Sequence, residues 1–111
     1  MSDPHRITIH LTDHPPVIVD DREWPVIART VWHDADDPGR ARDRAYVRVR
    51  RSREDGRVIV YGLRVEAAQE VMGGFYVPSD LNGVLDAIRK TCALIGLDPA
   101  PVFAEMPAVA L

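Results

Sequence analysis

The chain has 111 residues, 46% of them hydrophobic, and a formal net charge of −3, so we expect one domain over residues 1–111 with a compact core. Its apolar runs are too short to cross a membrane, and residues 1–6 lack the basic and apolar regions of a signal peptide, which favours a cytoplasmic location. The one cysteine, Cys92, excludes an internal disulfide and a cysteine-based metal cage.

The first third of the chain reads as extended structure. Ile7, Ile9 and Leu11 alternate with polar residues, a period of two that predicts a half-buried strand. Residues 13–16 contain two prolines and are expected to end this strand. Residues 17–19 form a brief apolar run that we expect to be extended as well.

The segment 24–33 is ambiguous. Trp24, Ile27 and Val31 fit a helical stripe, but β-branched residues are frequent here and favour a strand, which is our prediction. Residues 34–43 are polar and contain a Pro-Gly pair, so we expect a loop.

The basic segment 40–64 carries nine of the fourteen cationic side chains and predicts a β-hairpin. Its turn is expected at residues 53–56, as a type I turn in which Gly56 takes the left-handed conformation. That turn fixes a register in which Val47 lies opposite Leu63. A shift by one residue would mix apolar and charged partners on each face, which burial penalises.

The predicted register sorts the side chains of the hairpin onto two faces. The inward face is expected to hold Val47, Val49, Arg51, Ile59, Tyr61 and Leu63. The outward face is the predicted partner-binding site, made of Tyr46, Arg48, Arg50, Val58, Val60 and Arg64.

The C-terminal half contains the clearest helical signal. Residues 66–77 are expected to be loop with a short edge strand near the end. Apolar residues from Leu81 to Ile95 recur at helical spacing, so we predict a helix over about 80–95, closed by Gly96. The apolar tail 97–111 is expected either to wrap the core or to dock on a second chain as a homodimer contact.

Together these elements predict an α+β fold. We expect a mainly antiparallel sheet of about four strands with the single helix packed on one of its faces. The other face of the sheet would stay open and would be available for binding.

Charge is segregated along the chain. Residues 1–37 sum to −5, residues 38–64 to +6 and residues 65–111 to −4. This pattern indicates a surface with distinct charged regions. Six carboxylates of the first segment are expected to lie in solvated loops and turns or, as the sharper alternative, to form a secondary acidic surface: Asp20, Asp21, Glu23, Asp34, Asp36 and Asp37.

No pattern in the chain points to catalysis. The four histidines all precede residue 34, and His10 and His14 have the i, i+4 separation of a helical metal site. The alternation before them and the two prolines after them argue against a helix, so no metal ligands are assigned. Cys92 falls on the buried stripe of the helix, where a small core residue is expected. No nucleophile, base and orienting residue occur at a recognisable spacing. We therefore predict no catalytic residues, no cofactor and no enzymatic activity.

Three readings of the outward hairpin face stay open. Arginines that alternate along a two-stranded ribbon, with Tyr46 to stack on a base, would suit nucleic acid. Arginine, tyrosine and valine together are also typical of the core of a protein interface. The third reading is a solvated surface without a partner. The leading hypothesis is a binding or inhibitory module that engages a protein or nucleoprotein surface, and direct nucleic-acid binding is the alternative.

The stretches Trp24-Pro-Val-Ile-Ala28 and Asp55-Gly-Arg-Val-Ile-Val-Tyr-Gly62, followed by the capped helix, resemble short accessory proteins carried by proteobacterial phages and integrative elements. This resemblance implies a small non-enzymatic protein of a mobile element. Some such proteins block host defence, for example as anti-CRISPR proteins. The resemblance supplies no functional residues to transfer.

Overall fold

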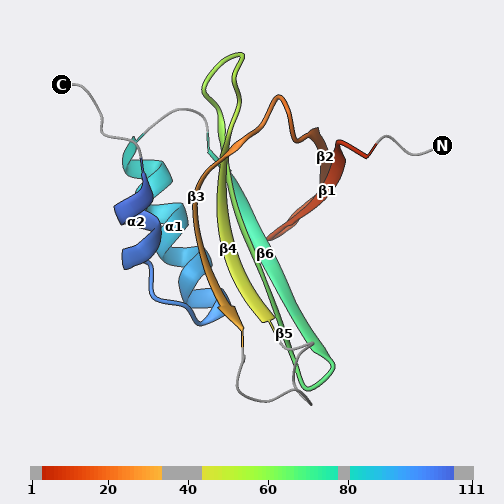
Figure 1. The fold of residues 1–111 in the computed structure, drawn as a ribbon, viewed down its shortest axis with the longest axis vertical. Helices are drawn as coiled ribbons and strands as arrows, with labels where there is room; N and C mark the ends of the chain where they lie inside the picture. The colour runs from red at the N-terminus through yellow and green to blue at the C-terminus, as the bar shows by residue number, and fades with distance from the viewer. Residues whose placement is uncertain (1–3, 34–43, 78–80, 107–111) are drawn as a thin grey trace.

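The computed structural model describes residues 4–33, 44–77 and 81–106 and has an α+β fold (Figure 1). A four-stranded antiparallel sheet has the order β3-β4-β5-β6, and a separate two-stranded sheet pairs β1 with β2. The strands are β1 (Arg6–Leu11), β2 (His14–Asp20), β3 (Val26–His33), β4 (Arg44–Arg51), β5 (Val58–Glu66) and β6 (Gln69–Val77). The helices are α1 (Leu81–Ile95) and α2 (Ala100–Glu105).

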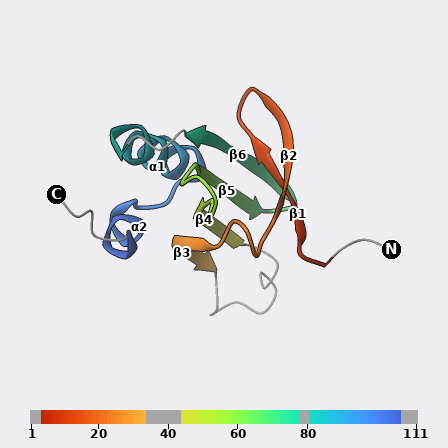
Figure 2. The same cartoon turned by 90° about the horizontal axis from the view of Figure 1, so that it is seen from above.

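The molecule is built in three layers (Figures 1 and 2). Both helices lie on one face of the four-stranded sheet, and the β1–β2 hairpin lies on the other. The predicted fold class is confirmed, including the helix over the sheet, and segment 24–33 is a strand as predicted. The hairpin layer was not foreseen as a separate sheet. None of the helices in the described ranges is long and apolar enough to cross a membrane.

The prolines that were expected to end the first strand lie inside the second one. Pro15 and Pro16 are exposed residues of β2, which begins at His14. A strand at the edge of a sheet tolerates proline because no neighbouring strand needs its missing N–H. The alternation predicted for β1 is confirmed, since Ile9 and Leu11 are buried between exposed neighbours.

The register of the β4–β5 hairpin differs by one residue from the prediction. Val49 lies opposite Val60, and Val47 opposite Gly62 rather than Leu63. The loop holds four residues, 53–56, because the Ser52 N–H donates to the Arg57 carbonyl at 2.8 Å. Gly56 does take the predicted left-handed conformation, with φ of 75°.

This shift turns every side chain of β5 to the opposite face from the one predicted. Val58 and Val60 face the helices and are buried, whereas Tyr61 and Leu63 face the hairpin. Gly62 is consistent with the observed register, because a Cβ at this position would lie 2.6 Å from Ile95 Cγ1 of α1. Only glycine fits between β5 and the helix here.

Two hydrophobic clusters hold the layers together. The first, between the sheet and the helices, includes Val47, Val49, Val58, Val60, Ile88, Ile95 and Val102. The second, between the sheet and the hairpin, consists of Ile9, Leu11, Val19, Ile59 and Tyr61, with Trp24 and Tyr46 packed against it. The strand β5 contributes to both clusters, and five consecutive residues from its start are buried.

The segment expected to be mostly loop is the nine-residue strand β6. A two-residue turn, Ala67 and Ala68, connects it to β5 by placing Glu66 opposite Gln69. Both alanines have positive φ, 52° and 63°. This conformation normally requires Asn or Gly, so the sequence carries no turn signal at this position.

The C-terminal region closes the helix layer. The prediction for α1 is confirmed, and Gly96 ends it with φ of 83° while its N–H donates to the Cys92 carbonyl at 2.7 Å. In the tail, α2 packs on the core through the fully buried Val102. The expectation that the tail wraps the core therefore holds for 100–105, while 107–111 and the predicted loop 34–43 lie outside the described residues.

Candidate functional site

The hairpin covers only part of its face of the sheet. The strand register places Val31, Tyr46, Leu63 and Met72 directly opposite one another, in a row that crosses all four strands. Val31 is 55% exposed and Met72 39% exposed, while Tyr46 and Leu63 between them are half-buried. This apolar row across the sheet is therefore only partly covered by the hairpin, and its ends at Val31 and Met72 are exposed.

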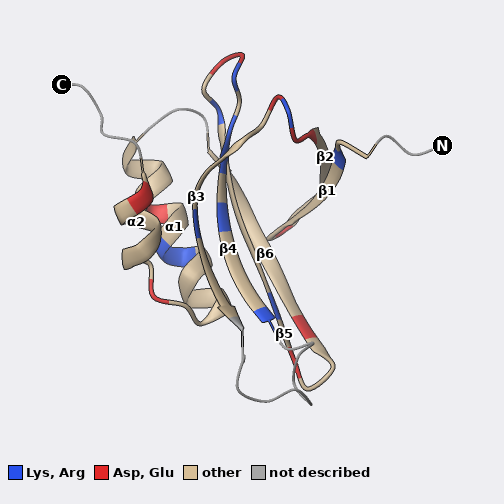
Figure 3. Ribbon diagram, in the orientation of Figure 1, with Lys and Arg blue, Asp and Glu red and all other residues tan. Residues whose placement is uncertain are grey.

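Arginines flank this row on both sides. The cross-strand pair Arg29 and Arg48 lies on the side of the row nearer to the β1–β2 hairpin. Arg44, at the start of β4, lies on the other side. Figure 3 shows basic residues along β3 and β4 in this region. We call the surface made by the row and these arginines the open face: Arg29, Val31, Arg44, Tyr46, Arg48, Leu63 and Met72.

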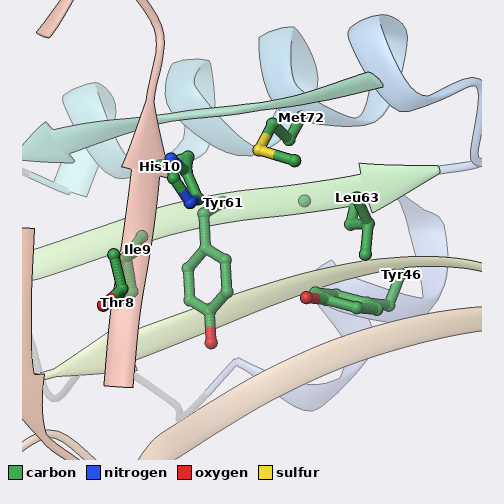
Figure 4. A pocket seen from close by; sticks show the side chains of 8 residues that line it. Thr8, Ile9, His10, Tyr46, Tyr61, Leu63 and Met72 are labelled. Carbon is green, nitrogen blue, oxygen red and sulfur yellow. The ribbon is translucent and has the colours of Figure 1, made fainter. Parts of the chain in front are cut away.

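A hollow of about 100 Å³ lies where β1 crosses the sheet beside the open face (Figure 4). Tyr61, Leu63 and Met72 line it from the sheet, and Thr8, Ile9 and His10 line it from β1. The ring of Tyr46 closes one side and meets Tyr61 edge to face at 6.3 Å between centroids. The hollow is therefore mostly apolar, with polar atoms at its rim.

Tyr46 and Arg48 are held together before any partner binds. The Arg48 guanidinium carbon lies 4.0 Å from the centroid of the Tyr46 ring, a cation–π contact. Both side chains lie on the open face as the sequence predicted. Because the contact already limits their rotamers, less conformational entropy is lost when they bind a partner.

Arg50 belongs to the predicted site but is a structural residue. Its exposed fraction is 9%, its Nε donates to the Tyr61 hydroxyl at 2.8 Å, and its Nη1 donates to the Trp24 carbonyl at 2.8 Å. The guanidinium therefore links the sheet to the segment before β3. It is not available to a partner.

Three more predicted contact residues lie on the helix side of the sheet. Val58 is 5% exposed and Val60 fully buried in the helix-side cluster. Arg64 donates from Nε to the Ile95 carbonyl at 2.5 Å and from Nη2 to the Gly96 carbonyl at 3.2 Å. It therefore satisfies carbonyls at the end of α1. The prediction placed these residues on the outward face because its β5 register was shifted.

The tip of the β4–β5 hairpin also makes contacts within the molecule. The Arg57 guanidinium forms an ion pair with Asp55 and lies near the rings of Trp24 and Tyr76, 5.4 and 5.9 Å from their centroids. The hydrogen bond from Arg57 lowers the pKa of Asp55, and the same bond raises the pKa of Arg57. The charge of Arg57 is thus paired with Asp55 within the molecule.

The described part of the predicted acidic surface lies between β2 and β3. Asp20 accepts two hydrogen bonds from the Arg22 side chain, which lower its pKa from 3.8 to about 2. Asp21 pairs with His5 at 3.0 Å, and Glu23 is exposed. The other three predicted members, Asp34, Asp36 and Asp37, lie outside the described residues.

The described side chains offer no site for a metal ion. Within residues 4–33, 44–77 and 81–106, no three His, Cys, Asp or Glu residues are grouped so that they could hold one. Cys92 is buried in α1, and burial raises the pKa of its thiol to about 11, with a smaller contribution from Asp98. A thiol with so high a pKa is a poor nucleophile at neutral pH.

The sequence prediction missed Arg29, Val31, Arg44, Leu63 and Met72. Met72 fell in a segment predicted as loop, and Leu63 was assigned to the wrong face by the shifted register. Val31 and Arg29 lie on a strand that was predicted, but their position beside Tyr46 and Arg48 depends on the pairing of β3 with β4. No local signal in the sequence specifies that pairing.

Comparisons with protein-family models, curated proteins and solved structures find no match to this chain. The resemblance to accessory proteins of mobile elements therefore stays a prediction.

Proposed function

We propose that the protein is a small non-enzymatic binding module that engages a protein or nucleoprotein surface through the open face. The observation that carries this proposal is the partly exposed row Val31, Tyr46, Leu63 and Met72 across the sheet. Tyrosine, methionine and arginine are the residues enriched in protein interfaces. A rigid sheet that presents them needs little reorganisation on binding.

The open face also suggests the character of the partner. The hollow beside Tyr46 suits an apolar side chain that projects from the partner surface. Arg29, Arg44 and Arg48 on both sides of the row favour carboxylates around that side chain. Complementary charge of this kind accelerates association and excludes basic partners.

Direct nucleic-acid binding is the second candidate, supported by the same three arginines next to Tyr46. Its support is smaller than the sequence suggested, because Arg50, Arg57 and Arg64 make internal contacts. Three phosphate contacts would give a slope of about −2.7 in log K against log salt on duplex DNA, at about −0.9 per contact.

The partner-binding test compares two double variants as bait in pull-downs from host lysate. Tyr46→Ala with Arg48→Glu changes the open face. Ile18→Ala with Arg6→Glu is the matched control, because these residues are exposed on β1 and β2 outside the open face. A specific protein retained by the wild type and the control but lost from the open-face variant supports the proposal. A partner retained equally by all three contradicts it.

Fluorescence anisotropy with labelled single-stranded and duplex DNA and RNA separates the two candidates. We expect no binding at physiological salt. Salt-dependent binding that the open-face variant loses and the control keeps would replace the proposal by nucleic-acid recognition. Circular dichroism must first show that both variants are folded.

The resemblance to mobile-element proteins suggests an inhibitory role, in which the open face covers a surface of a host defence complex. This role can be tested in cells whose CRISPR system targets a plasmid. Expression of the wild type should raise the transformation efficiency of that plasmid, and expression of the Tyr46→Ala, Arg48→Glu variant should not. An equal rise in transformation efficiency with both proteins would show that inhibition does not depend on the open face.

A further inference from the structure

Among the described residues, the first half of β6, around Glu70 and Met72, is a free sheet edge. In the second half of β6, the Thr12 N–H donates to the Gly74 carbonyl at 2.9 Å, and the Gly74 N–H donates to Thr12 Oγ1 at 3.2 Å. Gly74 therefore directs both backbone groups outward, away from β5. Because alternate residues of an antiparallel strand direct these groups to the same side, Met72 and Glu70 do so too. Their outward groups have no partner in the described part of the chain.

The opposite edge of the sheet is protected in part. The outward N–H of Arg29 on β3 donates to Glu105 Oε2 at 3.0 Å, and α2, which carries Glu105, packs along that strand. Natural proteins protect sheet edges in this way because an open edge pairs with other strands. No element of the described ranges lies along the outer edge of the first half of β6 (Figure 1).

Apolar side chains border the free edge on both faces of the sheet. Val71 is 40% exposed on the helix side, where Leu94 of α1 is 44% exposed, and Met72 is 39% exposed on the other side. A Cβ added to the neighbouring Gly73 would lie 2.7 Å from Leu94 Cδ2, which places the end of α1 directly over the edge strand. A strand added here would bury apolar surface on both of its faces.

We propose that the free edge of β6 pairs antiparallel with the same edge of a second copy. Strand edges are self-complementary under a two-fold axis, so a single surface can supply both sides of a closed dimer. The pairing would join the two four-stranded sheets into one. It would also bring the two α1 helices side by side, with Leu94 facing its counterpart.

Charge and the existing Thr12 contact select one register. An axis through Glu70 would set two carboxylates opposite each other, and an axis through Met72 would require the Gly74 groups that Thr12 already occupies. An axis through Val71 pairs Glu70 of each copy with Met72 of the other. This register uses the outward groups of both residues and avoids a like-charge pair, so it is the one we propose.

The first test is the oligomeric state of the full chain by analytical ultracentrifugation over a range of concentrations. The wild type should shift from the 12.4 kDa monomer toward twice that mass, and Val71→Lys should weaken dimerisation at least tenfold. The matched control, Ile18→Lys, changes an exposed apolar residue on the hairpin and should dimerise like the wild type. A monomer at every concentration, or unchanged dimerisation of Val71→Lys, would overturn the proposal.

A cysteine variant tests the register independently of whether Val71→Lys folds. In the proposed register, Val71 lies opposite itself in a non-hydrogen-bonded pair, where Cα atoms are about 4.5 Å apart, within the range of a disulfide. Val71→Cys should therefore give a covalent dimer on mild oxidation, and Ile18→Cys should not. Dimers without this crosslink would refute the register. The open-face residues Tyr46 and Arg48 are unchanged in these variants, so a failed dimer leaves the proposed function intact.

Discussion

At the scale of single residues, neighbouring arginines on β4 have opposite roles. Arg48 and Arg50 point to the same side of the sheet, and in sequence both fit a basic binding face. The structure separates them through burial, because the half-buried Arg48 stacks on the ring of Tyr46 whereas Arg50 donates to two oxygens in the interior. Arginine content alone therefore overstates the basic surface of this protein.

Replacement of each of these arginines by methionine should separate the two roles. Arg50→Met leaves the Tyr61 hydroxyl and the Trp24 carbonyl without their donor, and we expect a loss of about 2–3 kcal/mol in the free energy of unfolding. Arg48→Met replaces the cation–π contact with Tyr46 by a thioether–ring contact and should change stability by no more than about 0.5–1 kcal/mol. Urea unfolding of both variants measures this difference, and equal losses would contradict the assignment.

Asp20 predicts a component of stability that depends on pH. Its pKa is lowered from 3.8 to about 2 by the Arg22 side chain, so the folded state prefers the charged carboxylate. This contribution is fully present above the unfolded pKa and is lost as the pH falls through about 2. Asp20→Asn should therefore flatten the decline in stability between pH 4 and pH 2. Parallel curves for wild type and variant in thermal melts across this range would refute it.

At the scale of elements, the β5–β6 turn is a strained connection. Ala67 and Ala68 both occupy the left-handed region, which costs an L-residue with a Cβ about 1–2 kcal/mol. Asn and Gly adopt this conformation more easily and form the preferred two-residue turn of a hairpin. Because two alanines give no turn signal, the sequence prediction missed this turn and most of the strand β6 that follows it.

The double variant Ala67→Asn, Ala68→Gly should stabilise the protein by about 1–2 kcal/mol. Ala93→Gly is a suitable control, because Ala93 is exposed in α1 and glycine in a helix costs about 1 kcal/mol. The two substitutions should shift the midpoint of thermal unfolding in opposite directions. A lower midpoint for the turn variant would show that the alanines are not strained.

The sequence predicted β4 better than β5 for a physical reason. In β4, valines alternate with tyrosine and arginine, so the buried face can be read from the pattern. In β5, the run from Val58 to Leu63 is apolar on both faces because helices cover one side and the hairpin the other. The prediction therefore assigned the two faces of β5 from the length of the β4–β5 loop alone. The loop has four residues and not the three that were predicted, so the two faces were exchanged. Three of the six predicted contact residues, Val58, Val60 and Arg64, consequently lie on the helix side.

At the scale of the whole molecule, the two clusters share a central strand. Ile59 and Tyr61 of β5 face the hairpin, while Val58 and Val60 of the same strand face α1. The hairpin layer therefore packs on a strand that the helix layer also holds in place. Loss of either layer exposes one face of β5, which should couple the two layers in unfolding.

Ile9→Ala tests this coupling. Ile9 is 1% exposed in the hairpin-side cluster, and truncation of such a residue costs about 2–4 kcal/mol. We expect one cooperative transition with a lower midpoint, coincident by fluorescence and circular dichroism. Ile18→Ala, at a 66% exposed position on the same hairpin, should leave the midpoint nearly unchanged. Two separate transitions would show that the hairpin unfolds by itself.

The unequal edges of the sheet determine how far self-association can extend. A strand protein with two open edges can add copies at both ends and grow into a fibre. Here Glu105 occupies the outward N–H of Arg29 and α2 packs along β3, whereas no described residue covers the β6 edge of the same sheet around Glu70 and Met72. In the dimer that we propose, growth would therefore stop at two copies. Removal of the Glu105 carboxylate would open a second growth point and convert a self-limiting assembly into one that can polymerise.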